Sequence, residues 1–183
     1  MANRIKLIDL LKEGSNQTYD YGCVMLYFDF PLMDKIHNVI DPKDIYYEEG
    51  DRSFGLEDEP HTTLLYGLHK EVSVKDVKEV LDQFEFFPCV IHNASLFEND
   101  YDVLKFDVKG ENLHEANSVL KQFPHTSNFP NYHPHMTIGY LKKGTGKKYT
   151  KILKEVEYEL IPNYAVYSMP DGSKHNIKIK INE

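Results

Sequence analysis

The chain has 183 residues, 41% of them hydrophobic, which is enough for one packed domain. Its formal net charge of −8 argues against binding long DNA or RNA through phosphates, although a small nucleotide in a locally basic pocket remains compatible. No apolar run approaches the roughly 18 residues of a membrane span, and the N-terminus lacks the apolar core of a signal peptide. We therefore expect a soluble cytoplasmic protein in which Cys23 and Cys89 are free thiols.

Hydrophobic periodicity predicts both strands and helices along the chain. The expected strands cover residues 21–30, 61–67, 88–97, 101–108, 135–141, 158–169 and 177–181. The expected helices cover residues 5–11, 73–84, 112–123 and 152–156, with a helical turn or two between 31 and 44. This order predicts an α+β fold with helices on the outer faces of a sheet or pair of sheets. We expect residues 1–20 to be an extension, residues 21–183 the domain, and residues 46–60 a solvated acidic connector.

Two short stretches share one pattern, in which His-x-Thr is followed by apolar residues, a glycine and a tyrosine. In a strand, side chains two residues apart lie on the same face, so His61 points the same way as Thr63, and His135 the same way as Thr137. Either copy alone is most simply a strand that contains a structural histidine. Two copies 74 residues apart predict equivalent pieces of a duplicated lobe, with their imidazoles and hydroxyls converging on one cleft.

Paired histidines and threonines supply the groups that phosphodiester cleavage needs without a metal. One imidazole can deprotonate the attacking hydroxyl and the other can protonate the leaving oxygen, because histidine titrates near neutrality. Threonine hydroxyls can donate to the non-bridging oxygens, where negative charge gathers in the transition state. We predict that His61, Thr63, His135 and Thr137 are catalytic, without assigning which histidine is the base.

The two His-x-Thr segments resemble the signature motifs of the 2H phosphoesterase superfamily, which includes RNA 2′,3′-cyclic phosphodiesterases and 2′-5′ oligonucleotide hydrolases. The resemblance covers residues 21–181 and implies a bilobal fold, with two pseudo-repeated sheet-plus-helix halves around a central groove. The segments 22–30, 61–68 and 133–141 are most similar to the phage anti-CBASS nucleases. Those enzymes cut, without a metal, the cyclic di- and trinucleotides that bacteria use as antiviral signals.

The resemblance implies a metal-independent phosphodiesterase that hydrolyses 3′-5′ linkages of cyclic di- or trinucleotides such as cGAMP. A phage would use it in the host cytoplasm to evade CBASS immunity. The expected partner is a small cyclic nucleotide, with no cofactor, long nucleic acid, membrane or obligate protein partner. The alternatives are an RNA 2′,3′-cyclic phosphodiesterase, a 2′-5′ oligonucleotide hydrolase and a non-catalytic cyclic-nucleotide sponge.

A nucleotide substrate also requires surfaces on which its bases can stack, and the chain has 13 Tyr and 10 Phe. Stacking on an aromatic ring contributes about 1–3 kcal/mol per base. Tyr27, on the first expected strand, and Tyr167, on a late one, are the candidate substrate-binding residues. A tyrosine that simply packs within its strand is the competing interpretation for both.

Two further patterns have ordinary explanations. His133 and His135 could bind a metal from one strand face, but the residues beside them supply no third ligand, and we expect no metal site. Residues 144–148, Gly-Thr-Gly-Lys-Lys, lack the spacer and the Ser/Thr of a phosphate loop. We expect a flexible basic turn there, whose lysines help to attract an anionic substrate.

Overall fold

The computed structural model describes residues 18–182, so the helix expected over residues 5–11 lies outside the described part. The strands are β1 (Gly22–Asp29), β2 (His61–Leu68), β3 (Glu85–Phe86), β4 (Cys89–Glu98), β5 (Tyr101–Lys109), β6 (His135–Lys142), β7 (Tyr158–Ser168), β8 (Lys174–Ile177) and β9 (Lys180–Ile181). The helices are α2 (Met33–His37), the 3-10 helix η2 (Pro42–Asp44), α3 (Val74–Leu81), α4 (Leu113–Leu120) and α5 (Lys147–Ile152). The architecture is mixed and dominated by sheet, and none of the described helices is long and apolar enough to cross a bilayer.

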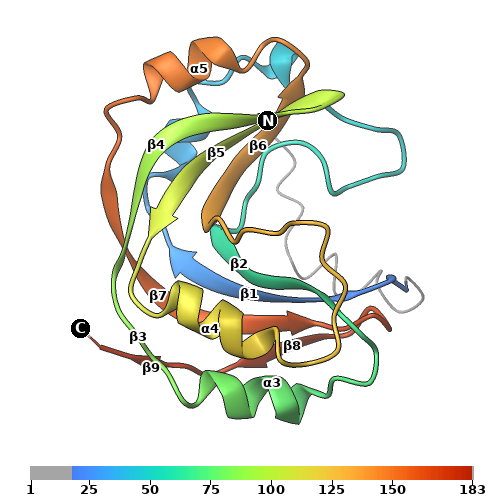
Figure 1. The fold of residues 1–183 in the computed structure, drawn as a ribbon. Coiled ribbons are helices and arrows are strands. Elements are labelled where there is room, and N and C mark those ends of the chain that lie inside the picture. Colours follow the sequence, from blue (N-terminus) through green and yellow to red (C-terminus); the bar gives the residue numbers. More distant parts are fainter. Residues whose placement is uncertain (1–17, 183) are drawn as a thin grey trace.

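Seven of these strands form one antiparallel sheet in the order β2-β1-β7-β4-β5-β6, with β8 paired to β7. β7 holds the sheet together because residues 161–168 pair with β1 and residues 158–160 pair with β4. β2 and β6 are the end strands of this path, yet they contact each other. Figure 1 shows the cause, which is a bend of the sheet that brings the beginnings of β2 and β6 together.

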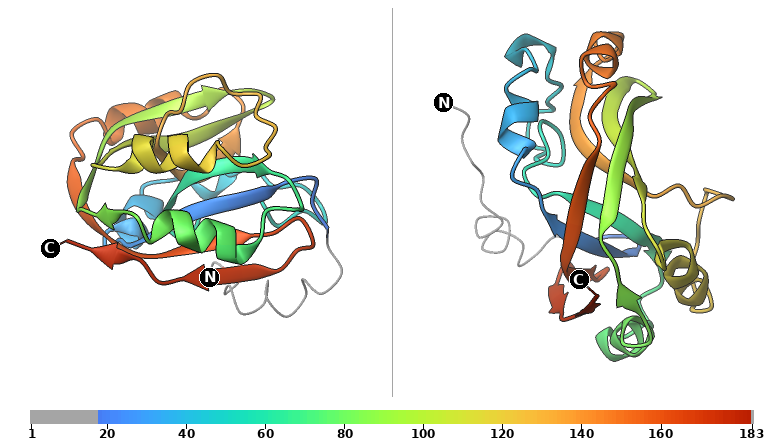
Figure 2. Two further views of the ribbon diagram at one scale, coloured as in Figure 1. Left: turned by 60° about the horizontal axis from the view of Figure 1, so that its bottom comes forward. Right: turned by 90° about the vertical axis from the view of Figure 1, so that its left-hand side faces the viewer.

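One face of the sheet around β1 and β7 is apolar and packs beneath helices. Val24 and Leu26 of β1 are fully buried there. Tyr167 of β7 is the cross-strand partner of Val24, and its hydroxyl donates to the carbonyl oxygen of Val72 at 2.9 Å, just before α3. α3 lies against α4, and α4 contacts β2, while α5 contacts β4 in the other part of the sheet (Figure 2).

The two helices expected to start near Ser73 and Asn112 are present, but they begin differently. α3 has the expected capping box, in which Ser73 Oγ accepts from the backbone N–H of Asp76 at 3.1 Å and Asp76 Oδ2 accepts from that of Ser73 at 2.8 Å. Asn112 has a left-handed φ of 65° and no side-chain cap. Its amide instead donates to the carbonyl oxygen of Glu85 at 2.6 Å, which ties the start of α4 to β3.

The last expected helix is displaced toward the N-terminus. The sequence predicts it over residues 152–156, whereas α5 covers residues 147–152 within the basic stretch. The reason is the anchor at Tyr149, whose buried hydroxyl donates to Asp44 at 2.5 Å and accepts from the backbone N–H of Asp41 at 2.9 Å. This long-range contact selects which residues form the helical turns.

The end of the chain is also more divided than expected. Residues 177–181, expected as one strand, contribute to both β8 and β9, and β9 pairs in parallel with the unexpected β3. Strands of two residues are too short to show any periodicity. They form here because the last residues of the chain run beside the segment that follows α3.

Candidate active site

The beginning of β2 places His61 beside two stacked tyrosines. His61 is half-buried, and its ring stacks on that of Tyr27, its cross-strand partner, with centroids 5.1 Å apart and planes at 28°. Tyr27 in turn stacks on Tyr164 of β7 at 5.3 Å and 2°. Tyr27 is only 7% exposed because both of its faces are covered. Tyr27 therefore lies beside His61, as expected, and orients the imidazole. Neither face of its ring is open for the stacking of a nucleotide base.

Tyr167 does not lie on this face of the sheet. It is 0% exposed and belongs to the core under α3, so it cannot contact a ligand bound beside His61, contrary to prediction. Tyr164 is three positions earlier in β7, and residues an odd number apart on a strand point to opposite faces. Tyr164 is the cross-strand partner of Tyr27 and therefore points to the same face of the sheet. The sequence would have identified it only if the pairing of the two strands had been known.

The beginning of β6 places His135 in a more charged setting. His135 is half-buried and contacts the ring of Phe97 edge-on, with centroids 5.0 Å apart and planes at 88°. Across β5–β6, Asp107 is the partner of His135 and Lys105 is the partner of Thr137. The Lys105 ammonium lies 4.6 Å from the centre of the same Phe97 ring. Lys105, Phe97 and His135 therefore form one contiguous cluster.

Lys105 is a buried charge that the sequence analysis missed. It is 7% exposed, and its ammonium donates to Ser95 Oγ and to Asp107 Oδ1, both at 2.8 Å. The Asn93 amide donates to the other oxygen of Asp107 at 2.6 Å. The pattern Lys-x-Asp in an otherwise apolar strand was the available signal, because buried charges are rare unless they are paired.

The two histidines share the same backbone contact. Nδ1 of His61 lies 2.8 Å from the carbonyl oxygen of Glu59, and Nδ1 of His135 lies 2.9 Å from that of His133. A carbonyl oxygen can only accept, so each Nδ1 carries the proton and each Nε2 is left for chemistry. A neutral ring then offers Nε2 as a base, and a protonated ring offers Nε2–H as an acid. His133 contributes through its backbone.

The charges around His135 favour its neutral form. Burial lowers the pKa of His135, and the positive charges of Lys105 and His61 lower it further, although the contact with the His133 carbonyl and the charge of Asp107 oppose this. The influence of His61 places the two imidazoles within electrostatic range of each other. The lowered pKa keeps His135 neutral, and a neutral imidazole is the form that can take a proton at Nε2.

The groups around His61 are mainly carboxyl groups. Burial raises the pKa of Glu59, the charge of Glu57 raises it further, and the positive charges of Lys174 and His61 act against that rise. Two carboxyl groups and Lys174 therefore lie on the His61 side of the site, whereas the Lys105–Asp107 ion pair lies on the His135 side. The site is symmetric in its motif and asymmetric in its electrostatics.

The glycines of the two motifs allow loops to close over the end strands. Gly67 has a φ of 113°, and a Cβ there would lie 2.0 Å from the carbonyl oxygen of Thr126, whose N–H donates to Gly67 at 2.9 Å. A Cβ at Gly139 would lie 2.7 Å from Leu56, with which Gly139 forms a β-bridge. Each motif thus combines a histidine and a threonine on one face with a backbone that a loop can approach closely.

A side chain from each neighbouring segment also anchors β2. The Tyr132 hydroxyl donates to the carbonyl oxygen of Thr63 at 2.9 Å, and the buried Asn117 amide of α4 donates to that of Leu64 at 2.6 Å. The hydroxyl of Thr63 contacts the Cys23 thiol, whose pKa burial raises to about 12, so the thiol stays neutral. These contacts hold the backbone of the first motif rigidly behind its histidine.

No cluster of three or more His, Cys, Asp or Glu side chains that could hold a metal is found within residues 18–182.

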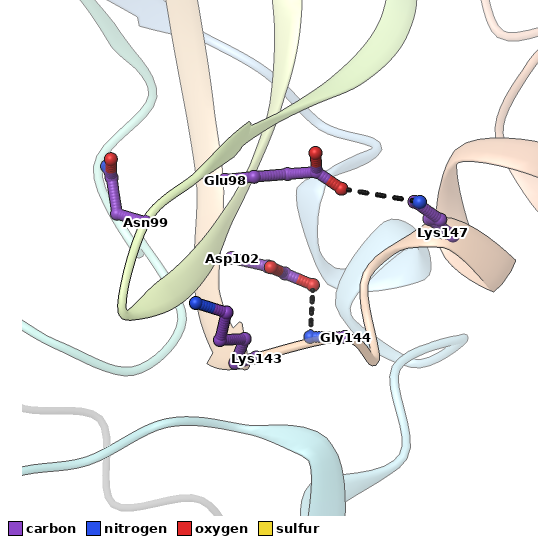
Figure 3. A pocket seen from close by; sticks show the side chains of 6 residues that line it. All are labelled: Glu98, Asn99, Asp102, Lys143, Gly144 and Lys147. Atoms are coloured by element: carbon purple, nitrogen blue, oxygen red, sulfur yellow. Dashed lines mark hydrogen bonds and ion pairs between the residues drawn. The ribbon is translucent and has the colours of Figure 1, made fainter.

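A separate hollow lies at the other end of β5 and β6 (Figure 3), lined by Glu98, Asn99, Asp102, Lys143, Gly144 and Lys147. Asp102 there accepts from the backbone N–H groups of Gly144 and Gly146, at 3.0 and 2.9 Å. A carboxylate therefore occupies the donors that a phosphate would need, and the basic turn is anchored.

Comparison with known families agrees with the motif geometry. The model of the 2′-5′ RNA ligase superfamily matches residues 37–163, well over half of the chain, and the match includes both His-x-Thr segments. No curated protein matches the chain. Members of this superfamily, the 2H phosphoesterases, are phosphodiesterases and ligases, so the coarse activity is that of a phosphoesterase enzyme. The chain belongs to the 2′-5′ RNA ligase superfamily.

Proposed function

We propose that this protein is a metal-independent phosphodiesterase that cleaves 3′-5′ linkages of cyclic di- or trinucleotides, with His61 and His135 as its acid–base pair. The observation that carries the proposal is the matched pair of imidazoles at the adjoining beginnings of β2 and β6, each with Nδ1 on a backbone carbonyl. Two positioned proton-transfer groups are what a phosphoryl transfer without a metal requires.

In the proposed reaction, the ribose 2′-hydroxyl beside the scissile phosphate attacks phosphorus. One imidazole Nε2 takes the hydroxyl proton, the P–O5′ bond breaks, and the Nε2–H of the other imidazole protonates the leaving 5′-oxygen. The first product is a linear nucleotide with a 2′,3′-cyclic phosphate and a 5′-hydroxyl. The hydroxyls of Thr63 and Thr137 donate to the non-bridging oxygens as charge develops there.

Two features support a small substrate with more than one base. A partly exposed aromatic ring lies beside each histidine, Tyr164 next to the Tyr27–His61 stack and Phe97, 39% exposed, against His135. The net charge of −8 disfavours a long polyanion but is compatible with a di- or trinucleotide. The sequence resemblance carries two further parts of the proposal. One is the role in phage evasion of CBASS, and the other is that β2 and β6 are equivalent strands of two pseudo-repeated halves.

The family description favours a second candidate, an activity on 2′-5′ linkages. The sequence resemblance adds an activity on RNA 2′,3′-cyclic phosphate ends. The acid–base pair would serve either reaction, because each removes a proton from an attacking hydroxyl or water and delivers one to a leaving ribose oxygen. A non-catalytic sponge is less well supported, since a binder has no use for two imidazoles with free Nε2 atoms.

A substrate panel tests these possibilities. The protein would be incubated in EDTA with 3′-5′ cyclic di- and trinucleotides, 2′-5′ oligoadenylate and an RNA ending in a 2′,3′-cyclic phosphate, and products resolved by chromatography. Linear products from the cyclic nucleotides, absent with His61→Ala and His135→Ala, are expected. Cleavage of the 2′-5′ substrate alone would contradict the proposal and support the second candidate. Release of intact cyclic nucleotide on denaturation of the protein would indicate a sponge. Equal cleavage of a 2′-deoxy analogue would exclude 2′-hydroxyl attack.

A further inference from the structure

The two halves of the site differ in one buried charge. Lys105 projects from β5 on the same face as its cross-strand partner Thr137, and directly opposite residues on neighbouring antiparallel strands have Cβ atoms roughly 4.5–5.5 Å apart. Within residues 18–182, its ammonium has two hydrogen-bond acceptors, Ser95 and Asp107. A lysine ammonium has three N–H groups, so one donor is not used by these partners.

Phe97 links this charge physically to the imidazole. One aromatic ring receives the Lys105 ammonium over its face, 4.6 Å from its centre, and packs against the His135 ring at 5.0 Å. Lys105 is only 7% exposed, so water screens its charge little, and this charge lowers the pKa of His135. Such a buried cation is costly unless it has a use or a partner.

We propose that Lys105 is a positioning residue whose charge makes His135 the general base and leaves His61 as the general acid. The inference rests on the proposed function and adds to it the direction of proton transfer. The 2′-hydroxyl proton passes to Nε2 of His135, and Nε2–H of His61 protonates the 5′-oxygen as the P–O5′ bond breaks. Both imidazoles then return to their starting states by proton exchange with water.

Other charged and titratable groups also lie around the two histidines. Those facing His135 are Lys105 and Asp107 on β5, His61 on β2, His133 before β6, and His92 on β4 opposite Asp107. Asp107 opposes Lys105, but its two oxygens are engaged by Lys105 and Asn93. The carboxyl groups of Glu57 and Glu59 lie on the other side, together with the charge of Lys174.

The charge effect can be tested in the whole protein by NMR titration of the imidazole ring signals, with His135 assigned from the spectrum of His135→Ala. Lys105→Met is expected to raise the pKa of His135, because it removes a positive charge that disfavours the protonated imidazole. Lys105→Arg keeps the charge and is expected to restore the parent value. Asp107→Asn removes the opposing charge and is expected to move the pKa downward.

Opposite shifts from Lys105→Met and Asp107→Asn distinguish an electrostatic effect from damage to the fold. Lys109→Met, which removes a charge from the exposed end of the same strand, is the matched control and should leave His135 unchanged. An unaltered His135 pKa in Lys105→Met, or shifts of the same sign in both variants, would overturn the role of Lys105. This titration needs no substrate, so it separates failure of the inference from failure of the proposed function.

The assignment of acid and base has its own chemical test. A nucleotide that the panel shows to be a substrate would be synthesised with sulfur in place of the bridging 5′-oxygen. A thiolate leaves without being protonated, so this analogue does not need a general acid. His61→Ala is expected to regain activity toward the sulfur substrate, approaching that of the parent enzyme, while His135→Ala stays inactive. Recovery of His135→Ala, or of neither variant, would overturn the assignment while leaving the phosphodiesterase activity itself established.

Discussion

His61 and His135 are held by the same backbone contact, in which Nδ1–H is donated to the carbonyl oxygen two residues earlier, at 2.8 and 2.9 Å. The contact sets the tautomer of each imidazole through the backbone alone. It leaves the two Nε2 atoms as the ring positions from which a proton could be taken or given.

Replacement of either histidine by alanine should abolish most turnover and leave the fold intact. Each proton-transfer group contributes about 10²–10⁴-fold, and both side chains are half-buried on the polar face, outside the apolar core. We expect kcat to fall by that factor in His61→Ala and in His135→Ala. Far-UV circular dichroism and thermal melting should show the parent fold, and a variant that keeps the parent kcat would remove that histidine from the mechanism.

Loss of the Thr137 hydroxyl should weaken stabilisation of the transition state. Removing one donor to a developing oxyanion typically costs about 10²–10³-fold in kcat. Thr137→Val keeps the shape of the side chain and should show this loss, whereas Thr137→Ser should retain most of the activity. Measured kcat and KM would decide, and if Thr137→Val affected KM alone, the hydroxyl would bind the ground state equally well.

Tyr164 and Tyr167 should respond differently although both lie in β7. Tyr167→Phe removes the hydrogen bond to Val72 and should lower the free energy of unfolding by about 1 kcal/mol, with kcat/KM unchanged. Tyr164→Ala removes a partly exposed ring beside the Tyr27–His61 stack, and KM should rise about tenfold, as expected for the loss of a base-stacking contact. Denaturant unfolding and steady-state kinetics on both variants measure this contrast, which equal kinetic effects would contradict.

The anchor of α5 should make stability depend on acidic pH. Hydrogen bonds from Lys148 and Tyr149 hold the pKa of Asp44 below its ordinary value, against the effect of burial. A carboxylate with a lowered folded-state pKa adds stability above its unfolded value of about 4 and loses it as the pH falls through the folded value. Asp44→Asn should therefore reduce Tm at pH 7, and the difference from the parent should shrink toward pH 3. A constant difference across this range would mean that charge plays no part.

The sequence by itself determined the local features of this protein. Period-two alternation showed that His61 shares a face with Thr63 and His135 with Thr137, because the direction of side chains along a strand is a local property. The capping box at Ser73 was identified for the same reason, since its two partners are three residues apart. The existence and type of the main strands and of α3 and α4 followed from the same periodicities.

Only the tertiary structure decided which of these local features meet. The bend of the sheet through β7 brings the end strands β2 and β6 into contact, and no pattern along the chain specifies that bend. The register of β5 against β6 places Lys105 beside Thr137, and the register of β1 against β7 places Tyr164, and not Tyr167, on the face of His61. Register and bending arise from packing between residues distant in sequence, so they become visible only when the chain is folded.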